Sequence, residues 1–382
     1  MEQYRKSFLN LTLETRWMNL HDKNAYEKAK LLNADKLHNL ISMLDEIKYE
    51  NKISDVCFLY KEGFRMSESL ENIRLRIEAL GMNFQFLSKI KTGMNGIERE
   101  TWLLEYEGSQ FVFVAGQRNV TLGWDIEKCP LGEGVLESLR EEFTLGREYY
   151  EEEMKEMEED YQNQIRKAEA SDDSEKAEKL REELSEELEA CGDQRDEGGY
   201  GDWEDYMKKW KEKLSECLSP LRMADIGDMI VEVDNRYIEK DASSLAEAVR
   251  SLKEGHFTLA TEDEWEYLCN GGARTLFRWG DTLDDVMEEI FNVGSVSMAK
   301  EKPLLEQPNM FGLFIAYNSY KNEIIDDENY VKGGDGGCSL CGGDGAIQIL
   351  PCYTAFYRER VGGDDCRLSK NYYCYRRIIR MP

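Results

Sequence analysis

Apolar residues near the start of the chain recur with a helical period. Leucine and isoleucine are spaced three and four residues apart over 31–47 and again over 70–80. This spacing places the apolar side chains on one face of a helix, and Gly81 is well placed to end the second one. We therefore expect residues 1–98 to form a mainly helical N-terminal domain.

Short strand-like runs follow this helical part. The segments WLLEY, QFVFVAG and NVTLGW lie within 102–124, are rich in β-branched and aromatic residues, and are separated by glycines. Such runs predict the strands of a hairpin. We assign 99–146 to the first part of a second domain and 219–382 to its remainder, where 246–252 is a short predicted helix.

An acidic helical segment separates these two parts. Residues 147–190 contain 18 acidic and 7 basic side chains, and two apolar stripes predict two antiparallel helices. Residues 171–174 (SDDS) between them are types that cap a helix N-terminus. We expect an inserted acidic arm over 147–218, which is either a solvated helical surface or a docking arm for a partner. We also expect 147–215 to be dispensable for folding of the body.

Composition and charge limit the classes of function. The chain has 77 acidic and 49 basic residues among 382, a net charge of −28, which disfavours nucleic-acid binding and polybasic membrane contact. No apolar run approaches the roughly 20 residues that cross a bilayer, and the N-terminus does not resemble a signal peptide. The ten cysteines are scattered along the chain, unlike those of a small secreted scaffold. We expect a cytoplasmic protein with mostly reduced cysteines.

Several motifs occur in the order that is typical of one protein family. They are FVFVAGQRNVTLG (111–123), TLATEDEWEY (258–267), RWGD (278–281), PNMFGL (308–313), KGG (332–334), YTAFYR (353–358) and YRRII (375–379). Together they resemble the formylglycine-generating enzyme (sulfatase-modifying factor) superfamily. The resemblance implies an α+β fold: a C-type-lectin-like domain that carries an inserted acidic helical hairpin and follows an N-terminal helical domain.

The TEDEWEY motif also has a physical interpretation of its own. Thr261 and Glu264 have the spacing of a capping box, in which each side chain bonds the backbone of the other residue. Trp265 and Leu268 would then share one buried helix face. We expect Trp265 and Trp279 to pack in the core.

The resemblance also directs attention to the cysteines. Oxidising members of the superfamily hold copper between two cysteine thiolates, which suit Cu(I), and convert a client cysteine to formylglycine with oxygen. Cys338 stands at the first cysteine position, but the second falls on Gly343. Cys341 lies three residues after Cys338 instead of five, and Cys352 lies beyond an additional glycine-rich stretch. Cys338, Cys352 and Cys341 are thus the catalytic and copper-ligand candidates, and ordinary buried or loop thiols are the alternative.

Other metals are less well matched by the sequence. The C-x-x-C pair at 338–341 also resembles half of a zinc site, with Cys366 and Cys374 as remote candidates. The superfamily's calcium motif falls on Lys321 or Asn322, and a cation there would repel calcium.

Further ligand candidates for calcium and iron are few. The neighbouring acids Asp326, Asp327 and Glu328 could replace the missing calcium ligand or could be ordinary surface charges. Iron-dependent relatives use three histidines, and this chain has three in total, without helical spacing: His21, His38 and His256.

A scaffold without a well-spaced copper pair favours a binding function. The resemblance implies this as well, because bacterial C-type-lectin-like domains serve as display scaffolds and as accessory parts of conflict or defence systems. Amphipathic tyrosine rings suit recognition surfaces, and our binding candidates are Tyr353, Tyr357, Tyr372, Tyr373 and Tyr375. We expect a non-catalytic module without a resident cofactor that recognises a protein or other ligand. The alternative is a copper-dependent oxidase.

Overall fold

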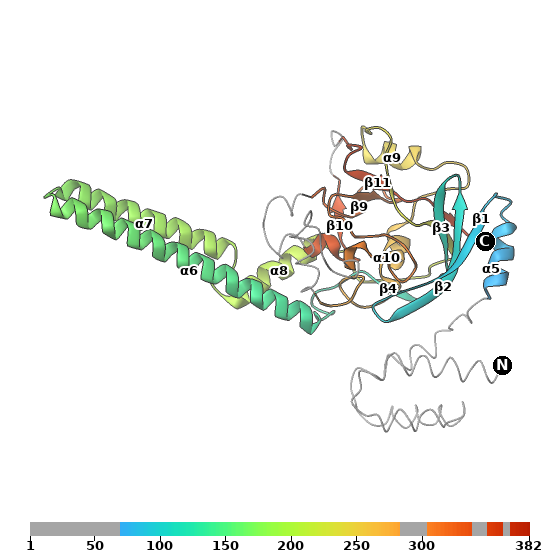
Figure 1. Ribbon diagram of the computed structural model, residues 1–382, viewed down its shortest axis with the longest axis horizontal. Coiled ribbons are helices and arrows are strands. Elements are labelled where there is room, and N and C mark those ends of the chain that lie inside the picture. Colours follow the sequence, from blue (N-terminus) through green and yellow to red (C-terminus); the bar gives the residue numbers. More distant parts are fainter. Residues whose placement is uncertain (1–68, 283–303, 338–349, 362–366) are drawn as a thin grey trace, which may run out of the picture.

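The computed structural model describes residues 69–282, 304–337, 350–361 and 367–382. Its architecture is α+β, as expected, with helices and mainly antiparallel sheets. Figure 1 shows a body of short strands and helices from which one long helical pair projects. No helix among the described residues combines the length and apolarity of a membrane span.

The first sheet has five antiparallel strands in the order β1-β2-β3-β6-β12. They are β1 (Gln85–Met94), β2 (Ile97–Tyr106), β3 (Ser109–Val114), β6 (Met229–Glu232) and β12 (Ile378–Arg380). Asn95 and Gly96 link β1 to β2 with positive φ, as a tight hairpin turn requires. Val114 of β3 lies opposite Met229 of β6, so the acidic arm leaves the body and returns between two neighbouring strands.

One helix covers a face of this sheet. Helix α5 (Leu70–Glu78) corresponds to the helix predicted over 70–80, and its Ile73 and Ile77 pack with Phe111 of the sheet. Strand β1, by contrast, lies within the stretch that we expected to be mainly helical. Its residues are mostly exposed or half-buried, with polar side chains between the apolar ones, so the strand period is weak. The helix predicted over 31–47 lies outside the described residues.

The second sheet supports the C-terminal part of the chain. Its order is β10-β9-β8-β11-β7, with one parallel pair, β8–β11. Helix α9 (Leu245–Ser251), predicted over 246–252, packs its Leu245 and Val249 with Ile324 and Val331. The remaining elements are β7 (Arg236–Tyr237), β8 (Asn322–Ile324), β9 (Tyr330–Gly333), β10 (Arg358–Arg360), β11 (Tyr373–Tyr375), the pair β4 (Val120–Leu122) and β5 (Arg222–Ala224), and the 3₁₀ turns η1 (Leu304–Glu306) and η2 (Leu350–Tyr353).

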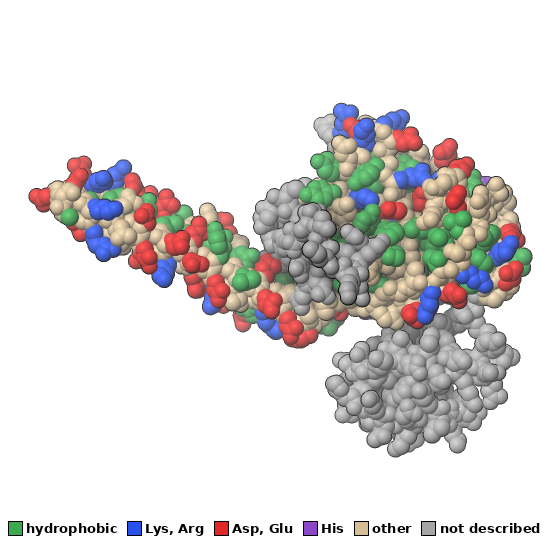
Figure 2. Space-filling model, viewed as in Figure 1, with side chains coloured by type: hydrophobic (Ala, Val, Ile, Leu, Met, Phe, Trp, Pro, Cys, Tyr) green, Lys and Arg blue, Asp and Glu red, His purple; other side chains and the backbone are tan. Residues whose placement is uncertain are grey.

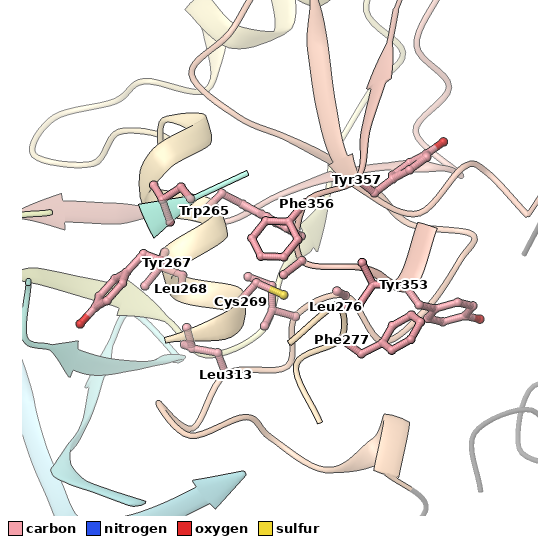
Figure 3. Packing of buried hydrophobic residues seen from close by; sticks show 14 of the residues in the cluster. Trp265, Tyr267, Leu268, Cys269, Leu276, Phe277, Leu313, Tyr353, Phe356 and Tyr357 are labelled. Carbon is pink, nitrogen blue, oxygen red and sulfur yellow. The ribbon is translucent and has the colours of Figure 1, made fainter. Parts of the chain in front are cut away.

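Helix α10 (Glu262–Asn270) lies at the centre of the main core. Its predicted capping box is present: the Thr261 hydroxyl accepts a bond from the Glu264 N–H, and the Glu264 carboxylate accepts one from the Thr261 N–H. Trp265 is fully buried, as expected. Trp279 is also buried and stacks on Phe277 at 4.9 Å between ring centroids. Figure 3 shows the apolar side chains that surround this helix.

The acidic arm contains two long antiparallel helices. They are α6 (Glu133–Ala170) and α7 (Ser174–Glu197), and Asp173 caps α7 by accepting a bond from the Lys176 N–H. Helix α6 begins before residue 147, where we placed the start of the arm. It continues through Gly146, and this glycine lies against Tyr200, where a Cβ atom would be 2.3 Å from the ring.

Helix α8 (Trp203–Cys217) has a different environment from the hairpin. In our division of the sequence it belongs to the arm, but Tyr206, Trp210 and Leu214 are fully buried in the main core. Removing 147–215 would therefore remove part of the core as well as the projecting hairpin.

Candidate functional site

Cys352 is the member of the proposed copper set that the structure describes. It lies on η2 with only 2% of its surface exposed. Burial raises the pKa of its thiol, and the nearby Asp335 carboxylate raises it further. A copper ligand has to be a thiolate, so copper binding by Cys352 would have to displace a proton that this environment holds tightly. Cys338 and Cys341 lie outside the described residues.

The described zinc candidate is also a buried thiol. Cys374 lies on β11 and donates its S–H to the backbone carbonyl of Asn322 at 3.5 Å. Burial raises its pKa as well, and Glu323 contributes. Cys366 lies outside the described residues. Within the described residues, no three His, Cys, Asp or Glu side chains are arranged to hold a metal ion.

A lysine ammonium stands where the resemblance implies a calcium site. Lys321 Nζ donates to Asn235 Oδ1 at 2.9 Å and to the Tyr317 hydroxyl, and it lies 5.4 Å from the centroid of the Tyr237 ring. Tyr317 in turn donates to Asp234 Oδ1 at 3.1 Å. The Lys321 ammonium already bonds the Asn235 and Tyr317 oxygens and would repel a bound calcium ion. The residues present therefore do not fit calcium.

The other metal-ligand candidates have surface roles. Asp326 forms a salt bridge with Lys253 at 2.5 Å, and the Asp327 carboxylate accepts backbone N–H bonds from the turn that follows it. Glu328 lies 3.7 Å from an Arg250 nitrogen. His256 is exposed in the turn after α9, and the other two histidines, His21 and His38, lie outside the described residues.

The five binding tyrosines have different environments. Tyr353 and Tyr357 are buried in the main core, 4% and 9% exposed. We expected these two rings to bind a partner, but their burial leaves almost no surface for contact. Tyr372 is 45% exposed, and Tyr373 and Tyr375 are half-buried on β11. Aromatic residues suit both a core and a recognition surface, so composition alone could not separate the two groups.

An open groove lies beside the tyrosines of β11. Its volume is about 440 Å³, and it is lined by Ser109, Gln110, Glu232, Val233, Asp234, Asn235, Arg236 and Phe314. Arg236 pairs with Tyr375 across the sheet, and Phe314 contacts the Tyr317 ring at 6.1 Å between centroids. The groove thus offers charged groups, amides and the Phe314 ring within one concave surface.

The charges in this groove are held in place by neighbours. Glu232 accepts bonds from Arg236 and Arg377 at 2.7 and 3.0 Å. Burial acts to raise the pKa of Glu232, but the two guanidinium groups outweigh it, and the pKa is lowered. Behind them, Arg376 and Glu323 form a buried ion pair at 3.1 Å. Glu232 and Arg236, which both line the groove, therefore keep their charges at neutral pH.

Sequence reasoning missed this groove because its residues come from separate segments. Gln110 comes from β3, the Asp234–Arg236 turn follows β6, and Phe314 precedes β8. None of them belongs to the motifs that carry the chemistry of the superfamily, and the one local signal was the aromatic spacing of Phe314 and Tyr317.

A wider groove lies where the arm meets the body. Its volume is about 820 Å³, and its apolar floor is formed by Leu136, Trp203 and Met207. The rim carries both signs of charge: Arg140, Lys208, Lys211, Glu127, Glu204, Glu212 and Glu216. Such a mixed rim selects no particular charge in a ligand.

The chain matches no protein-family model, no curated protein and no solved structure.

Proposed function

We propose that the chain is a non-catalytic binding module on a formylglycine-generating-enzyme-like, C-type-lectin-like scaffold, and that it recognises a protein partner. The observation that carries this proposal is the groove of about 440 Å³ beside β7 and β11. The side chain of Asp234 there is 53% exposed and that of Arg236 is 39% exposed. Together with the amides and Phe314, they provide the donors, acceptors and aromatic surface that polar peptide segments require.

Contacts made by residues of the motifs support the choice of scaffold. Glu266 of TEDEWEY accepts a bond from Lys332 of the KGG motif at 2.9 Å. Asn309 of PNMFGL donates to the carbonyl at the end of α10, Leu268, at 2.6 Å. Arg278 of RWGD donates to the Gln307 carbonyl at 2.9 Å. Motif residues thus bond another motif in one case and a segment directly next to a motif in the other two, as expected for parts of a single core.

The state of Cys352 supports a non-catalytic role. Its thiol is buried beside Asp335, whose negative charge opposes thiolate formation. The alternative, a copper-dependent oxidase with Cys338 and Cys352 as ligands, would need a thiolate at this position. Cys341 is the other candidate for the second ligand, and it lies outside the described residues.

Copper titration of the reduced protein separates the two functions. We expect no stoichiometric Cu(I) uptake, and we expect a Cys338→Ser variant to fold with unchanged stability. One equivalent of Cu(I) bound by the wild type and lost in Cys338→Ser would overturn the proposal in favour of the oxidase.

Peptide selection tests the groove itself. Peptides selected on the full chain from a random display library should bind it, and the variant Gln110→Arg/Asp234→Lys should weaken them by about tenfold or more. The control Gln162→Arg/Glu100→Lys has the same change in charge at exposed sites away from the groove. Selected peptides that bind wild type and both variants equally would show that the groove is not the binding site.

A further inference from the structure

The charge of the acidic arm is concentrated in one part of it. We define the shaft as residues 148–160 of α6 together with 182–197 of α7; it contains sixteen acidic and two basic side chains. The tip, residues 161–181, contains five of each. Figure 2 shows acidic side chains along the arm and several basic ones near its free end. The strong negative potential therefore lies next to the body.

Two apolar side chains are unusually exposed at the start of the shaft. Leu145 and Tyr149 are 66% and 60% exposed, more than any other large apolar residue in the described part of the chain. They are four residues apart on α6 and therefore lie on the same face. Glu152, Glu156 and Asp160 continue this row towards the tip at helical spacing, and all three are exposed.

Tyr149 has neighbours on both helices of the arm. The Tyr149 ring contacts Tyr150 at 5.4 Å between centroids. Glu153 raises the pKa of the Tyr149 hydroxyl, and Cys191 of α7 is close enough to contribute. Met154 is half-buried and, five residues from Tyr149, lies on another side of α6. The exposed face is therefore open to packing against a further helix, as in a helical bundle.

We propose that the face formed by Leu145, Tyr149, Glu152, Glu156 and Asp160 is a docking site for a basic amphipathic helix of a partner protein. Apolar side chains of that helix cover the two exposed residues, and its lysines and arginines pair with the three carboxylates. Charge complementarity selects this occupant. A second copy of the shaft would bring sixteen acidic side chains against sixteen, which is repulsive.

Binding of a designed probe to the full chain tests the site. The probe is a fluorescent amphipathic helix of leucine and lysine, about 18 residues long so that it spans five turns. Its scrambled version has the same composition without an apolar face. We expect the helix, and not the scrambled peptide, to raise the fluorescence anisotropy. Its affinity should fall about tenfold or more when salt is raised from about 50 mM to about 500 mM.

Two variants and their matched controls locate the binding. Leu145→Ser/Tyr149→Ser and Glu152→Gln/Glu156→Gln/Asp160→Asn should each weaken the helix by about tenfold or more. The control for charge, at the tip, is Asp172→Asn/Glu175→Gln/Glu178→Gln, and the control for apolar exposure is Leu75→Ser/Met223→Ser; both should bind like wild type.

Three outcomes would overturn the proposal. The scrambled peptide could bind as well as the helix, or the tip variant could lose as much affinity as the shaft variant. Either result would mean general attraction to a negatively charged protein. The third outcome is that the chain alone sediments as a dimer and that Leu145→Ser/Tyr149→Ser converts it to a monomer. This result would assign the face to a second copy of the chain.

Discussion

Glu266 and Lys332 form an ion pair that is closed off from solvent. The Nζ–Oε1 distance is 2.9 Å, and neither side chain has any exposed surface. Ser219 also donates to the Glu266 carboxylate, and Arg222 forms a salt bridge with it at 3.2 Å. The Lys332 ammonium lies 5.3 Å from the centroid of the Trp265 ring. The pair connects α10 to β9, and thus the main core to the second sheet.

Breaking this pair should be strongly destabilising. Lys332→Met leaves the Glu266 carboxylate buried without its ammonium partner, and such losses cost about 3–5 kcal/mol. Urea denaturation of the full chain measures the change. Lys91→Met is the control, because its pair with Glu98 is 65% and 68% exposed, and surface pairs contribute less than about 1 kcal/mol. Equal losses in the two variants would contradict the structural role of the buried pair.

Two glutamates, Glu359 and Glu232, should have opposite effects on the pH dependence of stability. Burial, and then Asp335, raise the pKa of Glu359 above 4.5, so its ionised form destabilises the fold as pH rises through that pKa. Glu359→Gln should therefore be more stable than wild type near about pH 7, and the gain should vanish below about pH 4.5.

Glu232 provides the opposite case. Its pKa is lowered, because Arg377 and Arg236 outweigh the effect of burial. The stability that it contributes is present above its unfolded pKa and is lost as pH falls through the lowered value. Glu232→Gln should therefore be less stable than wild type near about pH 7 and lose that difference in acid. Parallel pH profiles of unfolding free energy for both variants would refute the assigned environments.

Local signals in the sequence predicted the elements whose stabilising contacts are also local. The capping box of Thr261 and Glu264 needs only a three-residue spacing, and the apolar period identified α5, α9 and the hairpin α6–α7. Strands β7 to β11 have only two to four residues, which is too short for a period-two pattern to be recognised.

The candidate site depended on contacts that are distant in sequence. Tyr375 lies opposite Arg236 in the second sheet, a pairing that no motif indicates. Lys332 has the residue type of the surface and is fully buried, because its partner Glu266 is supplied by another motif. Tyr353 and Tyr372 are the same residue type in one tyrosine-rich region, yet one is core and the other is surface. Such assignments require the three-dimensional pairing of segments.

Cys352 should react slowly in the native protein. Its thiol is 2% exposed and its pKa is raised by burial and by Asp335, so both access and thiolate content are low. Timed alkylation with iodoacetamide, followed by peptide mass spectrometry, should label Cys352 at least about tenfold more slowly than the half-buried Cys129. Both should react alike in urea. Equal native rates would show that Cys352 is accessible and would reopen the copper interpretation.

The outer hairpin should be removable, whereas α8 should not. Around Tyr161 the two helices pack mainly on each other, through Ile165, Ala168, Ala177 and Leu180. Replacing residues 155–187 with a short Gly-Ser linker should therefore leave a body that unfolds in one cooperative transition, with nearly the same thermal midpoint.

Deleting 147–215, in comparison with the shorter replacement, tests whether α8 is needed for folding. It also removes Tyr206 and Trp210, which are fully buried in the main core. Truncating a single large core side chain costs about 3–5 kcal/mol, and domains of this kind have only about 5–15 kcal/mol to lose. This deletion should therefore abolish the cooperative transition in circular dichroism and calorimetry. A stable, monomeric body after the long deletion would mean that α8 contributes little to folding, and aggregation after the short one would mean that the hairpin is part of the body.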